Sequence, residues 1–177
     1  DTYVPFRHDA EIDNQRRHGF TKHYQLLEVT IGNEFPEVQE IANLFDFVWE
    51  KTDINYQPTS GAFPRHVDFL STMFKRAVEY DPSIANSPYN PITKSPDGWS
   101  FKRLLIPTDN WYPGQMFYFE EHAWSNWVAG EGIDFNWQNC RHSTANSGYS
   151  PRALIKITGL IRNDHWLANK KFKRFSL

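Results

Sequence analysis

The chain lacks three features that each mark a class of protein. Its 177 residues contain a single cysteine, Cys140, so neither an internal disulfide nor a cysteine-based zinc cluster can form. The longest unbroken apolar run is 116–119, far below the roughly 20 residues that a membrane-spanning helix needs. A formal net charge of −2 argues against a general nucleic-acid binder. Any metal site must therefore use His, Asp or Glu, and we expect neither membrane nor nucleic-acid partners.

The two ends of the sequence are polar. The first twenty residues are charged where a secretory signal peptide carries its apolar segment. Together with the single cysteine, this predicts a cytoplasmic protein. The C-terminal run NKKFKRF, 169–175, is expected to be a solvated basic surface. The histidines at 8, 18, 23 and 165 lie among charged residues, and we expect them at the surface as well.

Aromatic residues are abundant, at 16% of the chain with 7 Trp. Aromatic side chains favour strands and sandwich cores, and we assign none of the Trp or Tyr residues a catalytic role. Several runs of strand length are separated by Pro, Gly, Asn and Asp, which predicts a sandwich or barrel in one domain, 1–177. These runs are 23–32, 101–109, 114–121, 125–137 and 152–161.

One or two helices are expected beside the strands. In 35–52, apolar residues recur at three- and four-residue steps behind a Pro suited to a first turn, which predicts an amphipathic helix. The segment 69–81 has a similar spacing, and Asp68 is a candidate N-cap for it. The following stretch, 82–100, carries four prolines and predicts a long surface excursion that is either a lid or decoration.

The triplet His66-Val67-Asp68 is the start of a candidate metal site. On a strand, residues i and i+2 face the same side, so His66 and Asp68 can offer one nitrogen and one oxygen to one ion. His142 is the natural third ligand. Two imidazoles and one carboxylate on one face of a metal, with the other positions open, form the facial triad of non-haem Fe(II) oxygenases.

An arginine follows the distal histidine. An Fe(II) site of this kind needs a co-substrate that supplies electrons, and 2-oxoglutarate presents a distal carboxylate suited to the planar fork of an arginine. Arg152 begins an apolar run after the turn SGYSP, and its alternation partner Leu154 is typical of a core-facing residue. We therefore expect Arg152 to point inward and to bind the far end of 2-oxoglutarate.

These motifs resemble the Fe(II)/2-oxoglutarate-dependent oxygenases, whose fold is a double-stranded β-helix. Within that superfamily, FKRLLIPTDN (101–110) and SNWVAGEGIDFNWQNCRHSTANSGYSPRALIKI (125–157) are similar to the aspartyl/asparaginyl β-hydroxylase branch. The resemblance covers roughly 60–160. It matches Arg103 to an arginine near the C1 carboxylate of 2-oxoglutarate, His142 to the distal metal ligand and Arg152 to the C5-carboxylate anchor. The branch typically lacks the carboxylate ligand that Asp68 would supply here.

Each of these residues also has a plainer interpretation. Asp68 can cap a helix without any metal, His66 can be a half-buried strand histidine, and His142 can belong to a polar turn. At Arg103, the neighbouring Lys102 can take the inward side instead. Glu120 and His122 form a second carboxylate and imidazole pair on one strand face, which offers a different cupin-type site.

The sequence thus predicts a mainly β protein, a double-stranded β-helix of the jelly-roll, cupin-like kind, with its core at roughly 60–160 and one or two flanking helices. The resemblance implies an Fe(II)- and 2-oxoglutarate-dependent dioxygenase that hydroxylates an amino-acid side chain, free or in a peptide or protein, or another small molecule. We assign no catalytic residue beyond the metal ligands. The alternatives are a cupin-like metal enzyme without 2-oxoglutarate and a non-enzymatic jelly-roll binding module. Nothing in the sequence indicates the oligomeric state.

Overall fold

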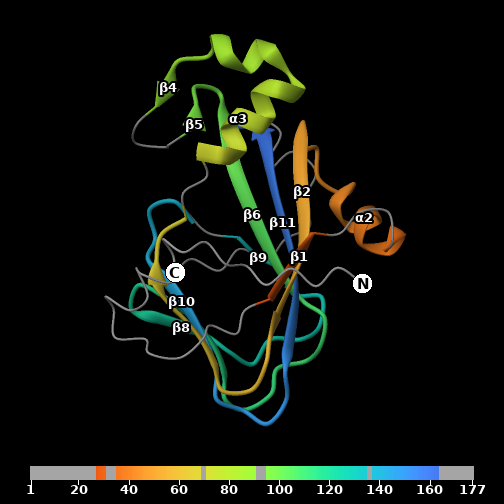
Figure 1. Cartoon of the computed structure of the whole chain (residues 1–177), viewed down its shortest axis with the longest axis vertical. Coiled ribbons are helices and arrows are strands. Elements are labelled where there is room, and N and C mark those ends of the chain that lie inside the picture. The colour runs from red at the N-terminus through yellow and green to blue at the C-terminus, as the bar shows by residue number, and fades with distance from the viewer. Residues whose placement is uncertain (1–26, 31–34, 69–70, 91–94, 135–136, 164–177) are drawn as a thin grey trace.

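The computed structural model describes residues 27–30, 35–68, 71–90, 95–134 and 137–163. The predicted surface histidines and the C-terminal basic run lie outside these residues. Two antiparallel sheets form the body of the molecule (Figure 1). The five-stranded sheet has the order β1 (Leu27–Thr30), β2 (Trp49–Gln57), β11 (Arg152–Arg162), β6 (Trp99–Pro107) and β9 (Ile133–Asp134). The four-stranded sheet has the order β3 (Gly61–His66), β10 (His142–Asn146), β7 (Gln115–Phe119) and β8 (His122–Trp124).

The chain passes back and forth between the two sheets. β2 lies in the larger sheet, β3 in the smaller, β6 in the larger, β7 and β8 in the smaller, β9 in the larger, β10 in the smaller and β11 in the larger. Eight strands wound in this way over two facing sheets form a double-stranded β-helix, the jelly-roll arrangement. The predicted fold class is therefore confirmed, and the β-helix begins at Trp49, before residue 60.

The longest shared edge runs along β11, which pairs with β2 on one side and β6 on the other. Its outward face carries Ile155 and Ile157, which pack with Leu104 and Ile106 of β6. Helix α2 (Pro36–Ala42) covers this face with Ala42, and Figure 1 shows α2 beside β2. A side chain at Gly159 would place its Cβ 2.5 Å from the ring of Phe47, so this position requires glycine for the ring to pack.

The helix predicted over 35–52 is only partly correct. α2 ends at Ala42, and the chain enters β2 at Trp49. The apolar spacing continued past Ala42 because Phe45 and Phe47 also pack on the core, but they do so from a connecting segment. Leu44, which the helical pattern placed on the same face, is 75% exposed. Tertiary contacts with the sheet therefore override the helical periodicity here.

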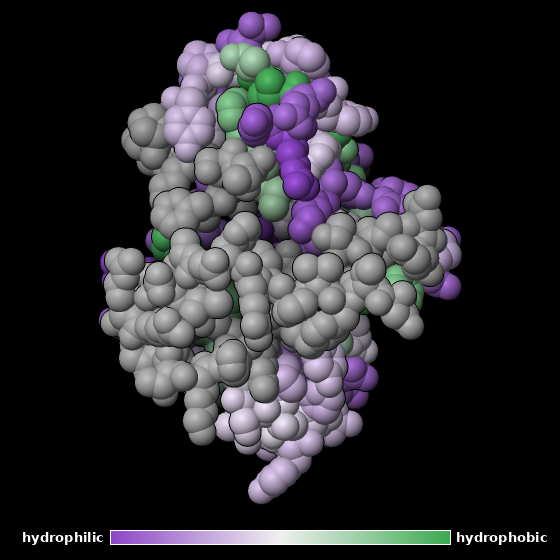
Figure 2. Space-filling view, viewed as in Figure 1, coloured by the Kyte–Doolittle hydropathy of each residue, from purple (hydrophilic) through white to green (hydrophobic). Residues whose placement is uncertain are grey.

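The second predicted helix and the proline-rich stretch form one end of the molecule. Helix α3 (Ser71–Tyr80) confirms the helical prediction for the described part of 69–81. It is followed by the 3-10 helix η1 (Pro82–Asn86) and the short strands β4 (Tyr89–Asn90) and β5 (Ser95–Pro96). Ile84 of η1 is fully buried and packs with Ala77 and Leu160, so this part is anchored to the end of the large sheet. Figure 2 shows apolar side chains gathered among hydrophilic ones at this end.

The described part of the segment 125–137 forms less strand than its sequence predicts. Within it, only Ile133 and Asp134 pair with β6, while Trp127 and Trp137 are buried outside any described strand. In the described part of the chain, no helix is both long and apolar enough to span a bilayer.

Candidate metal centre

Strand pairing brings the two predicted imidazole ligands together. His66 is the last residue of β3, His142 is the first residue of β10, and the two are direct partners across the small sheet. The pairing register between β10 and β3 shifts between His142 and Thr144, so the sheet has a local irregularity next to the site. The two imidazole rings lie 4.3 Å apart, centroid to centroid.

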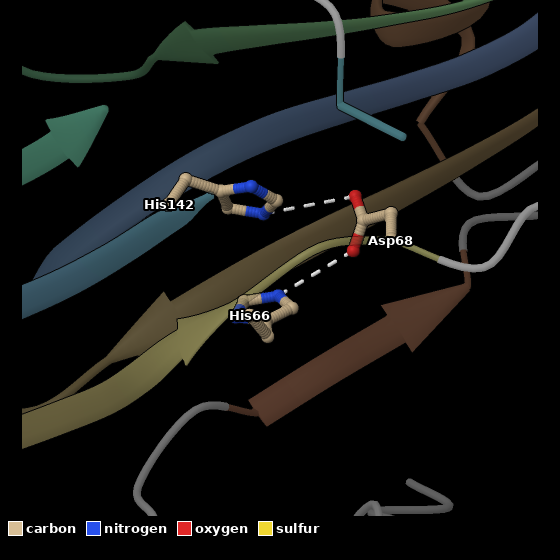
Figure 3. Close-up of side chains that lie close together, drawn as sticks. All are labelled: His66, Asp68 and His142. Carbon is tan, nitrogen blue, oxygen red and sulfur yellow. Dashed lines mark ion pairs between the residues drawn. The ribbon is translucent and has the colours of Figure 1, made fainter. Parts of the chain in front are cut away.

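Asp68 lies two residues beyond the end of β3 and completes the group. Its carboxylate oxygens lie 3.4 Å from His66 Nε2 and 3.8 Å from His142 Nε2 (Figure 3). One ligand atom from each residue lies within 4.8 Å of the others. Metal–ligand bonds are about 2.0–2.2 Å long, so atoms at these separations can reach one ion. The three predicted ligands are thus brought together at one site that can hold a metal.

The backbone fixes the orientation of both imidazoles. Nδ1 of His66 lies 2.8 Å from the carbonyl oxygen of Pro64, and Nδ1 of His142 lies 3.1 Å from that of Cys140. A carbonyl can only accept a hydrogen bond, so each contact places the proton on Nδ1. In this tautomer Nε2, on the side of the ring nearest Asp68, is the nitrogen that would bind a metal, as a ligating histidine requires.

Electrostatics keep the group in its metal-binding protonation state. Burial lowers the pKa of His142 to about 4, and the nearby Asp68 charge only partly opposes this shift. Burial alone would raise the pKa of Asp68, but the Arg103 guanidinium, together with the neighbouring His66 and His142, outweighs it and holds that pKa well below its usual range. At neutral pH the site therefore contains a neutral His142 and an ionised Asp68.

Arg103 points into the β-helix and forms an ion pair with Asp68. Its side chain is buried, its Nε donates to the Thr158 hydroxyl at 2.9 Å, and its guanidinium lies over the Trp137 ring at 5.6 Å. Lys102, the alternative inward residue, instead faces Asp134 at 3.4 Å. The inward position of Arg103 is therefore confirmed, while its predicted contact with 2-oxoglutarate stays a prediction.

The Asp68 carboxylate pairs with Arg103 and lies near both histidines. Residues 69–70, between Asp68 and the first described residue of α3, lie outside the described part of the chain, so the N-cap interpretation stays a prediction. The alternative site at Glu120 and His122 finds no support: among the described residues neither joins a group of three side chains that could hold a metal, and both are exposed. Glu120 instead accepts hydrogen bonds from Arg65 and from the backbone of Arg141.

Arg152 lies inside the β-helix, as its sequence position predicts. It is 3% exposed, and its guanidinium lies over the rings of Phe117 and Trp127 at 5.6 and 5.8 Å. Within the described residues its hydrogen bonds go to Gln57, Thr144 and the Met116 carbonyl, and no carboxylate pairs with it. Burial without a counter-charge lowers its pKa to about 9.

Two residues around Arg152 are missing from the sequence prediction. Thr144 shares a strand face with His142, so its position two residues further along β10 was a usable signal. Gln57 carried no such signal, because β2 was not predicted as a strand.

A second group of interior ionic side chains was not predicted, for the same reason. Asp53 of β2 is fully buried, and its carboxylate oxygens lie 2.6 and 3.2 Å from the ammonium groups of Lys51 and Lys156.

Comparisons with known proteins yield likenesses in structure only. No family model matches the chain, and no curated protein matches it in sequence. Among solved structures it is similar to the cupin domain of Schizosaccharomyces pombe Cnp3, with 8% identity over 77% of this chain and 66% of that chain and a TM-score of 0.43. A cupin domain from Bordetella pertussis shows 11% identity over 80% and 98%, with a TM-score of 0.42. A predicted oxalate decarboxylase from Thermotoga maritima shows 9% identity over 77% and 81%, with a TM-score of 0.41. With TM-scores this low, the assignment of the fold rests on the strand order of the chain itself.

Proposed function

We propose that this protein is an Fe(II)- and 2-oxoglutarate-dependent oxygenase that hydroxylates an amino-acid side chain, free or in a peptide or protein, or another small molecule. One observation carries the proposal: a two-histidine, one-carboxylate group shares the interior of one β-helix with a buried arginine that has no carboxylate partner among the described residues. The first suits a metal with open coordination positions, and the second suits an anion.

On the metal side, His66, Asp68 and His142 are the proposed ligands. The Nδ1 contacts to backbone carbonyls hold the imidazoles with Nε2 available, and Arg103 holds the Asp68 carboxylate in place. When bound, iron and 2-oxoglutarate would supply the oxidising chemistry with dioxygen, one oxygen atom of which enters succinate as CO2 is released while the other enters the substrate. The chain contributes ligand orientation and a buried setting for His142.

On the co-substrate side, Arg152 is the proposed anchor for the distal carboxylate. Its hydrogen-bond partner Thr144 lies two residues from His142 on β10, which corresponds to about 6.6 Å along a strand. A five-carbon dicarboxylic acid can span such a separation between the metal and the guanidinium. Arg103, beside Asp68, is the proposed neighbour of the other carboxylate, next to the metal.

Anaerobic spectroscopy tests this proposal directly. Fe(II) is added first and 2-oxoglutarate second, and the visible charge-transfer band of a chelated 2-oxo acid is recorded. We expect the band in the native protein, its loss in His142→Ala and weaker 2-oxoglutarate binding in Arg152→Ala. His122→Ala and Arg162→Ala are matched controls at exposed positions, and both should keep the band.

The other outcomes point to the alternatives. Metal binding without a band, unaffected by Arg152→Ala, would favour a cupin-like metal enzyme that does not use 2-oxoglutarate. An absence of metal binding would leave a jelly-roll binding module. The predicted cytoplasmic location and the small-molecule or peptide partner stay predictions.

A further inference from the structure

Gln57 lies at the centre of the interior surface around Arg152. It is the last residue of β2, it is the direct strand partner of Arg152, and it is 1% exposed. Its carboxamide oxygen accepts a hydrogen bond from Arg152 Nη2 and lies 3.3 Å from the Thr144 hydroxyl. The carboxamide oxygen therefore has partners, and the question is what its nitrogen does.

Two buried donors in this group have no acceptor among the described residues. Gln57 Nε2 and Arg152 Nε are both inaccessible to solvent, and neither makes a hydrogen bond to any part of the chain that the structure describes. A buried N–H group without an acceptor costs free energy, and such groups are rare unless a ligand or an ordered water completes them. Here the two unpaired donors belong to side chains that already contact each other through Gln57 Oε1 and Arg152 Nη2.

A carboxylate fits both donors because it offers two oxygens and only accepts hydrogen bonds. Its charge also balances the guanidinium of Arg152, which has no carboxylate partner among the described residues. We propose that Gln57 is a second binding residue for the distal carboxylate of the co-substrate, with its Nε2 and Arg152 Nε donating to that carboxylate. This inference rests on the proposed function and adds a residue that selects ligands ending in a carboxylate.

The plainer role for Gln57 is to hold Arg152 in place through its oxygen alone. Gln57→Glu and Gln57→Met together separate the two roles. Glutamate replaces the donor with a negative charge that competes with the ligand for Arg152, whereas methionine removes the donor without a charge. If Gln57 only positions Arg152, Gln57→Met keeps the preference for a ligand that ends in a carboxylate, because Thr144 and the Met116 carbonyl still hold the guanidinium. If Gln57 donates to the carboxylate, both variants lose a hydrogen bond to a charged group, and Gln57→Glu also repels the ligand.

The measurement compares two ligands in the Fe(II)-loaded protein under anaerobic conditions. 2-Oxoglutarate and 2-oxopentanoate have the same five-carbon chain and the same chelating end, but only 2-oxoglutarate ends in a carboxylate. In the native protein we expect 2-oxoglutarate to bind more tightly, and in Gln57→Glu we expect this preference to shrink by about tenfold or more. Binding of 2-oxopentanoate should stay unchanged. Gln39→Glu, an exposed position on α2, controls for the added charge.

The outcomes distinguish this inference from the proposed function. If neither 2-oxo acid gives a band in the native protein, the proposed function fails and the inference fails with it. If both give a band and Gln57→Glu keeps the full preference for 2-oxoglutarate, the inference is overturned while the proposed function stands. Thermal unfolding monitors folding of the variant. A preference retained in Gln57→Met, which removes the donor without a charge, would equally overturn the inference, whether or not Gln57→Glu folds.

Discussion

The two faces of β11 are both buried, yet only the inward face carries buried charged side chains. The outward face, represented by Ile155 and Ile157, is apolar and packs beneath α2. The inward face carries Arg152, Lys156 and Thr158, which are 3%, 6% and 0% exposed. A strand buried on both faces is usually apolar on both. Burying ionic groups is costly and adds little net stability, which supports our proposal that the inward face binds ligands.

The comparison also extends across the sheet. Thr158 pairs with Arg103 on β6 and with Lys51 on β2, so one row of polar residues crosses three strands at the level of the candidate metal centre. Four residues earlier on the same face of β11, Leu154 packs with Leu105 and Phe117. The interior of the β-helix thus mixes polar and apolar side chains, and Arg103 and Arg152 lie where the metal and the anion are proposed to bind.

The largest effect is expected for Arg152→Met on the inward face. Loss of the guanidinium should weaken 2-oxoglutarate binding by on the order of 100-fold, since a charge-assisted bidentate contact is removed. Because the change also removes a buried charge that has no carboxylate partner among the described residues, we expect the melting temperature of the ligand-free protein to stay the same or rise. Ligand titration measures the first effect and thermal unfolding the second. A large drop in melting temperature would show that Arg152 stabilises the fold, contrary to the ligand-binding role that we propose for the inward face.

Ile157→Ala on the outward face is expected to lower the stability of the fold without weakening the binding of metal or 2-oxoglutarate. Ile157 is fully buried beneath α2, and removing its side chain should lower the free energy of unfolding by about 2–5 kcal/mol. Metal and 2-oxoglutarate affinities, measured below the unfolding transition, should stay within about twofold of the native values because the inward face is unchanged. Denaturant unfolding provides the stability, and a parallel loss of metal affinity would show that the two faces are coupled.

The pH dependence of stability tests the electrostatics of the metal centre. The folded pKa of His142 is about 4, whereas an unfolded histidine titrates near 6.5. Between these values the unfolded chain binds more protons, so stability should fall as the pH drops from about 6.5 to about 4, by on the order of 2–3 kcal/mol from this residue. Denaturant unfolding of the metal-free protein at several pH values measures this decrease, and His142→Gln should make it smaller. An unchanged pH profile in His142→Gln would show that His142 is not held neutral.

Thr158→Val gives the smallest expected effect. It compares the inward face of β11, at Thr158, with the outward face at the neighbouring Ile157. Valine keeps the shape of threonine but cannot accept the hydrogen bond from Arg103 Nε. We expect a loss of about 1–2 kcal/mol in stability and about a tenfold loss in metal affinity, because Arg103 orients the Asp68 ligand. Ile157→Val, the neighbouring change on the outward face, is the matched control and should leave metal affinity unchanged. Equal metal affinities in the two variants would contradict the positioning role of Arg103.

Much of the candidate site could be predicted because its signals are local. The H-x-D triplet and the interval between His142 and Arg152 depend on residues close in sequence, and strand alternation correctly oriented Arg103 and Arg152. Gln57 and the ion group around Asp53 could not be predicted, since both lie on β2 and the helical spacing of 35–52 obscured where that strand begins. Their interior positions result from pairing with β11, about a hundred residues later in the chain.

The sequence by itself determined the type of fold and the candidate ligands, because alternation of apolar and polar residues and short motifs express local geometry. Only the tertiary structure decided that His66 and His142 are strand partners, that Arg103 pairs with Asp68, and that Arg152 is buried beside Gln57. These contacts join residues far apart in sequence, and no local pattern specifies the register at which distant strands meet. The chemistry that we propose for this protein depends on that register.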